Sequence, residues 1–185
     1  MSEKLAIETQ DLTKSYDGIT VVDHLNLLVK EGEVFGLLGD NGAGKTTTIL
    51  MLLGLTEPAS GTARVCGFNP TREPIKAKRL VGYLPEKVGF YENLTPRENL
   101  MFIAELNDIS YAEANSRIDE LLETVGISEA ADMTVGKFSR GMKQRLGIAD
   151  VLIKKPKVVF LDEPTAGLDP EGISQLLDLI ASMPK

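Results

Sequence analysis

A glycine-rich stretch near the start of the chain, GDNGAGKTT, has the residue types needed to hold a triphosphate. Its spacing is G-x-x-x-x-G-K-T, with Gly39, Gly44, Lys45 and Thr46 at the fixed positions. Glycines let successive backbone N–H groups curl around phosphate oxygens, the lysine reaches the β and γ phosphates, and the threonine hydroxyl binds Mg²⁺. An apolar run precedes the loop and an apolar helix pattern follows it, so an accidental turn is the weaker interpretation. The expected nucleotide-binding residues are Gly39, Asp40, Asn41, Gly42, Ala43, Gly44, Lys45, Thr46 and Thr47.

A second chemical signal is the pair of acids that ends the apolar run KVVFLDE. An open parallel sheet places ligand-contacting groups at the carboxyl ends of its strands, which is where Asp162 is expected. In phosphoryl transfer this is the position of an Mg²⁺-associated acid. Alone, the pattern is better explained as a helix cap, and it indicates a metal-associated acid only together with the Lys45 loop. Glu163 projects differently and is the candidate that polarises the attacking water.

A third signal is FSRGMKQR, which reads as the start of another helix. Ser139 has the capping position, and the apolar-periodic residues that follow are Leu146, Ile148, Ala149, Leu152 and Ile153. Helix starts attract anions because their unpaired N–H groups and the positive end of the dipole point outward. Taken alone, this stretch is more simply a serine-capped surface helix.

Composition restricts the class of protein. With 185 residues, 43% hydrophobic and 25% charged, the chain suits one well-packed globular domain. Its longest apolar stretch is far shorter than the roughly 20 residues that span a membrane, and its single cysteine, Cys66, cannot form an internal disulfide. The net charge of −7 opposes non-specific nucleic-acid binding. We therefore expect a soluble, cytosolic protein with no nucleic-acid partner.

The order of expected elements predicts an α/β fold. Alternating or apolar runs predict strands at LAIETQDLT, TVVDHLNLLV, EVFGLLG, TARVCG, RLVGYLP and KVVFLDE, with a turn at Asp17–Gly18. Capping signals at Thr95 and Ser110 start two helices, and DPEGISQLLDLIASM is a final amphipathic helix. The predicted fold is a P-loop NTPase core with a mainly parallel sheet, an antiparallel β subdomain near the N-terminus and an inserted helical subdomain. We expect one domain over 1–185, divided into 1–86, 87–154 and 155–185.

With these motifs in this order, the chain resembles the nucleotide-binding domain of ATP-binding cassette (ABC) transporters over essentially its whole length. FSRGM stands where the family has its signature, and AGLDP looks like the D-loop that contains Asp169. Tyr16 stands where an aromatic side chain stacks on adenine, and Glu86 in YLPE has the place of the γ-phosphate-sensing glutamine.

The resemblance implies a dimer and gives the second helix start a role. Two copies pack head to tail around two Mg-ATP, so that the signature of one chain faces the nucleotide held by Lys45 of the other. The signature residues are Ser139, Arg140, Gly141 and Met142. The implied catalytic residues are Glu163, Lys45 and Glu86, and the implied metal ligands are Thr46, Asp162 and Glu86. A helix terminus contributes at most about 2 kcal/mol to holding an anion, whereas association costs about 4 to 15 kcal/mol, so both grips on each nucleotide are needed.

Several residues depart from the family pattern. Arg140 and Met142 replace glycine and glutamine of the signature, as in two-component exporters whose ATPase is a separate polypeptide. A carboxylate at Glu86 could meet Mg²⁺ directly but would repel a γ phosphate. The family's switch histidine follows a strand that this chain does not reach, and the only histidine, His24, is better interpreted as a strand residue than as a catalytic one. We therefore expect an amino-terminal fragment of a longer ATPase, which binds ATP and turns it over poorly.

Three functions remain open at this stage. The leading hypothesis is an ATPase subunit that drives a separate transmembrane permease, with export favoured, and that lies on the inner face of the cell membrane through that partner. Its helical region near residues 87–100 would receive a short helix of the permease. The alternatives are a soluble ABC ATPase that acts on DNA or the ribosome, and a nucleotide-binding fragment with little turnover. The spacing between the Lys45 loop and Ser139 leaves no room for a long coiled coil, which disfavours the DNA-acting relatives.

Overall fold

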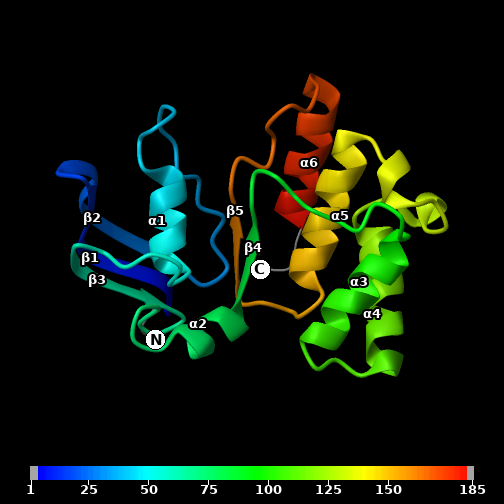
Figure 1. Cartoon of the computed structure of the whole chain (residues 1–185), viewed down its shortest axis with the longest axis horizontal. Coiled ribbons are helices and arrows are strands. Elements are labelled where there is room, and N and C mark those ends of the chain that lie inside the picture. Colours follow the sequence, from blue (N-terminus) through cyan, green and yellow to red (C-terminus); the bar gives the residue numbers. More distant parts are fainter. Residues whose placement is uncertain (1–3, 183–185) are drawn as a thin grey trace. The chain divides into compact units, whose positions relative to one another are not determined.

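The structure is a computed structural model that describes residues 4–182 (Figure 1). Its residues form two compact units, whose described parts are 4–81 and 82–182. The fold class expected from the sequence is confirmed: the chain is mixed α/β, with an antiparallel sheet near the N-terminus, a parallel strand pair and helices inserted between its strands.

The first unit is built on a three-stranded antiparallel sheet with the order β2-β1-β3. Strands β1 (Leu5–Tyr16) and β2 (Ile19–Lys30) form a hairpin, and β3 (Ser60–Val65) pairs with the other edge of β1. Asp17 and Gly18 both have positive φ, at 48° and 81°. A two-residue hairpin turn of type I′ requires this at both central positions, which explains the Asp-Gly pair predicted to turn the chain.

Two helices accompany this sheet. Helix α1 (Lys45–Leu52) contacts β2 and β3 and buries Met51 and Leu52. Helix α2 (Pro74–Leu80) begins with a proline, whose missing N–H costs nothing in a first turn. The glycine loop therefore lies at the start of a helix whose apolar residues are anchored in the unit's core.

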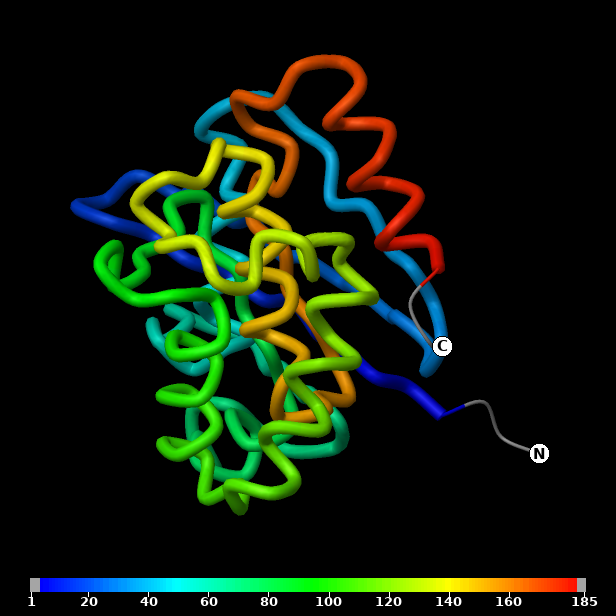
Figure 2. Tube along the Cα trace, turned by 90° about the vertical axis from the view of Figure 1, so that its right-hand side faces the viewer, coloured from blue at the N-terminus to red at the C-terminus, as the bar shows by residue number. Residues whose placement is uncertain are grey.

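One predicted strand is wrong. Residues 33–40, which contain EVFGLLG, are extended but belong to neither sheet (Figure 2). Val34, Phe35 and Leu38 are exposed rather than buried. An apolar run becomes a strand only where a neighbouring strand completes its ladder of hydrogen bonds, and no described strand pairs with this one. The run is apolar, as the sequence shows, but whether it pairs with another strand depends on residues far from it in the chain.

Apart from Val81, the parallel pair β4 (Val81–Leu84) and β5 (Val158–Leu161) belongs to the second unit. The backbone N–H of Asp162 donates to the carbonyl of Leu84 at 2.9 Å, so the register holds to the last residue of each strand. Because the two strands run in the same direction, the segments that follow them leave from one edge of the pair. That edge carries Glu86 after β4 and Asp162 after β5.

Helices form the rest of the second unit. They are α3 (Pro96–Leu106), α4 (Tyr111–Thr124), α5 (Arg140–Leu152) and α6 (Pro170–Ser182), with 3₁₀ turns at Ser128–Ala130 and Val135–Lys137. The predicted caps at Thr95 and Ser110 are both present, and Thr95 forms a capping box with Glu98. Gly126 has φ 68° just beyond the end of α4, as a helix stop requires.

The core of this unit draws on all four helices, and α3, α4 and α5 pack against one another (Figure 1). Its fully buried side chains include Leu100, Ile118, Leu146 and Leu176, one from each helix. Among residues 4–182, no helix is long and apolar enough to cross a membrane.

Candidate nucleotide site

The glycine loop folds around its own lysine. Lys45 is the first residue of α1, and its Nζ donates to the carbonyls of Gly39 at 2.8 Å and Asp40 at 3.1 Å. The backbone N–H of Ala43 also donates to the Asp40 carbonyl, at 3.1 Å, and this hydrogen bond closes a tight turn. A cation held over the first turn of a helix, beside backbone N–H groups, is an arrangement suited to phosphate.

Gly44 is the glycine whose absent side chain matters most. It is the N-cap of α1 with φ 82°, a left-handed conformation, and no side chain caps this helix. A Cβ here would lie 2.3 Å from the carbonyl oxygen of Val21 and 2.9 Å from Val22 Cγ2. The loop is therefore pressed against β2, and the helix start leaves its first-turn donors without a side-chain competitor.

Next to this loop lies a pocket of about 280 Å³. Its lining comes from β2, from the extended segment and from the loop with its helix: Val21, Val22, Asp23, Leu25, Leu37, Leu38, Ala43, Lys45 and Thr48. The walls are mostly apolar, and they carry one cation, Lys45, and one acid, Asp23. A pocket of this composition suits a ligand with an apolar part and a polar part.

Tyr16, the predicted adenine-stacking residue, ends β1 and is 45% exposed. The Nζ of Lys14 lies 4.9 Å from the centroid of its ring, so one face already has a cation. A half-exposed aromatic ring at a strand end can stack on a planar base. His24, by contrast, is an exposed residue of β2, as expected for a strand residue, and its Nδ1 lies 2.6 Å from Asp23 Oδ1.

The acids after β5 differ sharply in environment. Asp162 is 5% exposed, and the hydroxyl of Tyr83 on β4 donates to its Oδ2 over a long 3.5 Å. Burial, with the negative charge of Asp162 beside it, raises the pKa of the Tyr83 phenol, so this group stays a donor at neutral pH. Glu163 is exposed and has φ 49°, which is rare for a residue with a side chain. Of these two neighbouring acids, Asp162 is therefore buried and Glu163 is open to solvent.

Glu86 lies in the segment that leaves the same edge of the strand pair. It is exposed and follows β4 by two residues. Thr46, Asp162 and Glu86 all offer oxygen donors, which are the ligands that Mg²⁺ prefers, so their chemistry fits this ion. Among residues 4–182, no group of three or more His, Cys, Asp or Glu side chains could hold a metal ion on its own.

The signature residues form a capped helix start. Ser139 is the N-cap of α5, and its Oγ accepts from the N–H of Met142 at 3.2 Å. Gly141 has room beside it, because a Cβ there would find Leu168 Cδ2 at 3.8 Å. Lys143 pairs with Glu92 at 2.9 Å and lowers the pKa of that carboxyl, which ties the helix to the loop before α3. The predicted serine cap is confirmed in its geometry.

Arg140 is exposed, and its guanidinium lies against Gly167, where a Cβ would be only 2.2 Å from Nη1. Asp169, the predicted D-loop acid, accepts the N–H of Gly172 at 3.1 Å and so caps α6. The signature and the D-loop segment are thus in direct contact within one chain.

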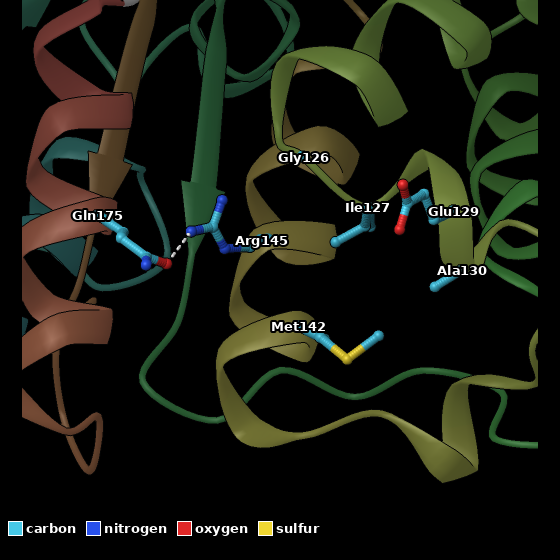
Figure 3. A pocket seen from close by; sticks show the side chains of 7 residues that line it. All are labelled: Gly126, Ile127, Glu129, Ala130, Met142, Arg145 and Gln175. Carbon is cyan, nitrogen blue, oxygen red and sulfur yellow. Dashed lines mark hydrogen bonds between the residues drawn. The ribbon is translucent and has the colours of Figure 1, made fainter.

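A cavity of about 330 Å³ borders the signature helix (Figure 3). Arg145 reaches toward Gln175 on one side and bonds it at 2.7 Å, while Met142 extends toward Ala130 on the other. Arg145 also donates to the carbonyl of Val125, the C-cap residue of α4, at 2.9 Å, so its positive charge lies at the C-terminal end of that helix. This cavity therefore belongs to the packing that holds α5 in place.

Sequence reasoning missed Asn99, which organises the start of α3. It is 4% exposed and bonds the N–H of Tyr91 at 2.9 Å, the carbonyl of Tyr91 at 3.1 Å and that of Thr95 at 3.0 Å. The signal was a polar residue at a position on the buried face of the helix, next to Leu100. Gln144 on α5 is a similar case, since it is 8% exposed and its Nε2 has no partner among the described residues.

Comparison with known proteins agrees with this architecture. Residues 22–166 match the family described as ABC transporter. The chain is 51% identical, over 97% of its length, to the bacitracin transport ATP-binding protein BcrA of Bacillus licheniformis, of which it covers 58%. It is 43% identical, over 96% of its length, to the daunorubicin/doxorubicin resistance ATP-binding protein DrrA of Streptomyces peucetius, of which it covers 54%.

A solved structure of an ABC transporter subunit also resembles the chain. The structure of cbiO1 from Clostridium perfringens, part of the ABC transporter complex cbiONQ, matches 96% of the chain with a TM-score of 0.86 and 30% identity, over 73% of its own length. A P-loop α/β protein with an inserted helical segment is the class that fold and site define. Within that class, the chain belongs to the ABC transporter family. It spans less than two thirds of the length of these curated relatives.

Proposed function

We propose that the chain is the ATP-binding and ATP-hydrolysing part of an ABC transporter. The observation that carries this is the Lys45 loop: a lysine held by the Gly39 and Asp40 carbonyls over an α1 start that no side chain caps. When ATP binds, Lys45 exchanges these carbonyls for phosphate oxygens, and the first-turn N–H groups complete the grip. Tyr16 stacks on the adenine.

In this proposal two chains close head to tail around two nucleotides. Ser139 and Gly141 of one chain then face the γ phosphate held by Lys45 of the other. Supporting this, Ser139 is exposed at a helix start and Gly141 leaves its approach open. The Ser139 hydroxyl can donate to the phosphate while it still accepts from Met142, because a hydroxyl both donates and accepts.

Hydrolysis requires a water aligned with the γ phosphate. In this proposal, exposed Glu163 orients and polarises the water. Buried Asp162, to which Tyr83 donates, the Thr46 hydroxyl and Glu86 would supply the protein's oxygen ligands to Mg²⁺. The ion neutralises charge on the phosphate oxygens when bound. Loss of the γ phosphate removes one grip on the signature, so the pair opens.

The proposed partner is a separate transmembrane permease, which would hold the chain at the inner face of the cell membrane. Export is favoured because relatives are named for bacitracin transport, linearmycin resistance and daunorubicin/doxorubicin resistance. Helices α3 and α4 are short, with 11 and 14 residues, which disfavours the coiled-coil relatives that act on DNA.

The test is ATP-dependent dimerisation of Glu163→Gln, which keeps the side chain's size but removes its charge. In ATP and Mg²⁺, light scattering after gel filtration should give twice the monomer mass, and ADP should give the monomer. Glu163→Gln combined with Lys45→Ala is the matched control and should stay monomeric in both. If Glu163→Gln binds ATP yet remains monomeric at tens of micromolar protein, the head-to-tail pair is wrong.

A further inference from the structure

Arg140 and Gly167 fit each other in shape. A Cβ on Gly167 would lie 2.2 Å from Nη1, 2.4 Å from Cζ and 2.9 Å from Nε of Arg140, so the guanidinium fills the space that any side chain would need. Gly167 also has φ 68°, which favours glycine independently. Among the residues that the structure describes, none forms a hydrogen bond or ion pair with the Arg140 side chain, so this contact is one of packing.

The segment that Arg140 touches leads directly back to Glu163. The N–H of Ala166 donates to the Glu163 carbonyl at 3.0 Å, and the N–H of Leu168 donates to Thr165 at 3.2 Å. Two consecutive turns therefore connect Glu163 to the start of α6. A shift of Gly167 moves Ala166, and through its hydrogen bond it moves the backbone that carries Glu163.

The contact is made by the Arg140 side chain. Gly141, the next residue of α5, leaves room beside the loop, because even an added Cβ there would find Leu168 Cδ2 only at 3.8 Å. Movement of the first turn of α5 is therefore passed to the loop after Glu163 through the packing of Arg140 against Gly167.

We propose that Arg140 is a positioning residue that couples the start of α5 to Glu163 within one chain. This inference rests on the proposed function, in which Ser139 senses one nucleotide and Glu163 acts on the other. Arg140 would then link the two nucleotide sites. When the first turn of α5 moves toward the phosphate held by the partner chain, Arg140 would move the loop that positions Glu163 at the chain's own nucleotide. A broad, planar guanidinium fills the space beside Gly167, whereas the compact ammonium of a lysine would not.

The alternative use of Arg140, as a direct phosphate ligand, makes a different kinetic prediction. A ligand that holds ATP equally in ground and transition states changes KM, whereas misplacement of Glu163 changes kcat. The experiment is ATP hydrolysis by Arg140→Gly, Arg140→Lys and Gly167→Ala in the complete natural protein. The control is Lys143→Gln, which removes a cation three residues along the same helix.

Arg140→Gly should lower kcat about tenfold or more and leave KM within about twofold. Gly167→Ala should act in the same direction, Arg140→Lys should fail to restore kcat, and Lys143→Gln should leave both constants near wild type. The double variant Arg140→Gly with Gly167→Ala should be no worse than Gly167→Ala, because the clash is gone. A raised KM with unchanged kcat in Arg140→Gly would make Arg140 a phosphate ligand and overturn the proposal.

Hydrogen exchange tests the contact separately from catalysis. The amides of Ala166 and Leu168 should exchange several-fold faster in Arg140→Gly than in wild type or Lys143→Gln, with no nucleotide present. Unchanged exchange at both amides overturns the coupling even if ATP binding and dimerisation behave as proposed. If the wild-type chain binds no ATP, the proposed function fails, and the exchange result still decides whether Arg140 holds the loop.

Discussion

The starts of α1 and α5 solve the same chemical problem in two ways. Helix α1 follows Gly44 in a left-handed conformation, has no side-chain cap and begins with Lys45. Helix α5 follows Ser139, whose own Oγ accepts from its first turn, and begins with Arg140. Both cations lie on nearby backbone, Lys45 at the Gly39 and Asp40 carbonyls and Arg140 at Gly167.

The first-turn N–H groups of α1 have no side-chain cap and can all face an anion, whereas the Ser139 cap already occupies part of the α5 start. At α1 nothing in the side chains competes with a ligand, and glycine permits the close approach of the loop. At α5 the cap uses part of the helix start already, and a ligand must share the serine. We therefore expect α1 to determine nucleotide affinity, and α5 to determine what happens once the nucleotide is bound.

The largest effect should come from Lys45→Ala. Loss of a charge-assisted contact to phosphate should weaken ATP binding at least about a hundredfold, equivalent to about 3 kcal/mol. Titration of the chain with a fluorescent ATP analogue measures this. Lys76→Ala, which removes an exposed cation of the same unit, is the control and should leave affinity unchanged. Equal affinities for both variants would remove the basis for ranking α1 first.

Gly44→Ala should destabilise the first unit nearly as much. The new Cβ would meet the Val21 carbonyl at 2.3 Å in a backbone conformation with φ 82°, and we expect a loss of about 3 kcal/mol. Gly42→Ala is the matched control, since φ is 87° there but nothing lies within 4 Å of the added atom. It should lose only about 1 kcal/mol. Urea unfolding of both variants gives the comparison, and equal losses would mean that backbone strain, not close approach, determines the glycine.

Helix α5 also differs from α1 in carrying a partly buried acid, Asp150. Burial raises the pKa of Asp150 from 3.8 to about 6, although Lys154 one turn on lowers it in part. The folded state then holds this proton more tightly than the unfolded chain, so stability from this group is present below about pH 4 and lost as the pH rises through 6.

Asp150→Asn should therefore flatten the fall in stability between pH 4 and 6, a change of at most about 3 kcal/mol. Urea unfolding at a series of pH values measures it. Asp178→Asn, at an exposed position of α6, should keep the wild-type profile. A wild-type stability that does not fall over this range would contradict the assignment to Asp150.

The smallest effect on nucleotide affinity should come from Ser139→Ala. Loss of the cap should cost about 1 kcal/mol of stability, while ATP affinity of the single chain stays within about twofold. ATP-dependent dimerisation in the Glu163→Gln background should be lost, because that step uses the serine. Ser110→Ala, which removes the cap of α4, is the control for the loss of a cap alone. Dimerisation that survives Ser139→Ala would leave the serine as a cap only.

Local signals in the sequence were enough for much of the fold. The Asp17–Gly18 turn, the Thr95–Glu98 capping box and the Ser139 cap each depend on a few neighbouring residues, and the structure has all three. The candidate site residues were found in the same way, because the glycine loop and its helix are contiguous. Their roles in catalysis stay predictions.

What could not be predicted depends on residues far apart in the chain. The run EVFGLLG has the composition of a buried strand, but no described strand pairs with it. The contact of Arg140 with Gly167 and the donation from Tyr83 to Asp162 join segments that no local pattern connects. Tertiary packing determines such pairs, and periodicity carries no information on them.

The left-handed backbone at Glu163 has a consequence for natural variation at this position. A glutamate at φ 49° costs roughly 1 kcal/mol of backbone strain relative to glycine, and this strain falls on the residue proposed to polarise the attacking water. Glu163→Gly should abolish turnover, while the relief of strain offsets part of the stability lost with the side chain. The chain thus carries its backbone strain at the carboxylate that its proposed chemistry needs.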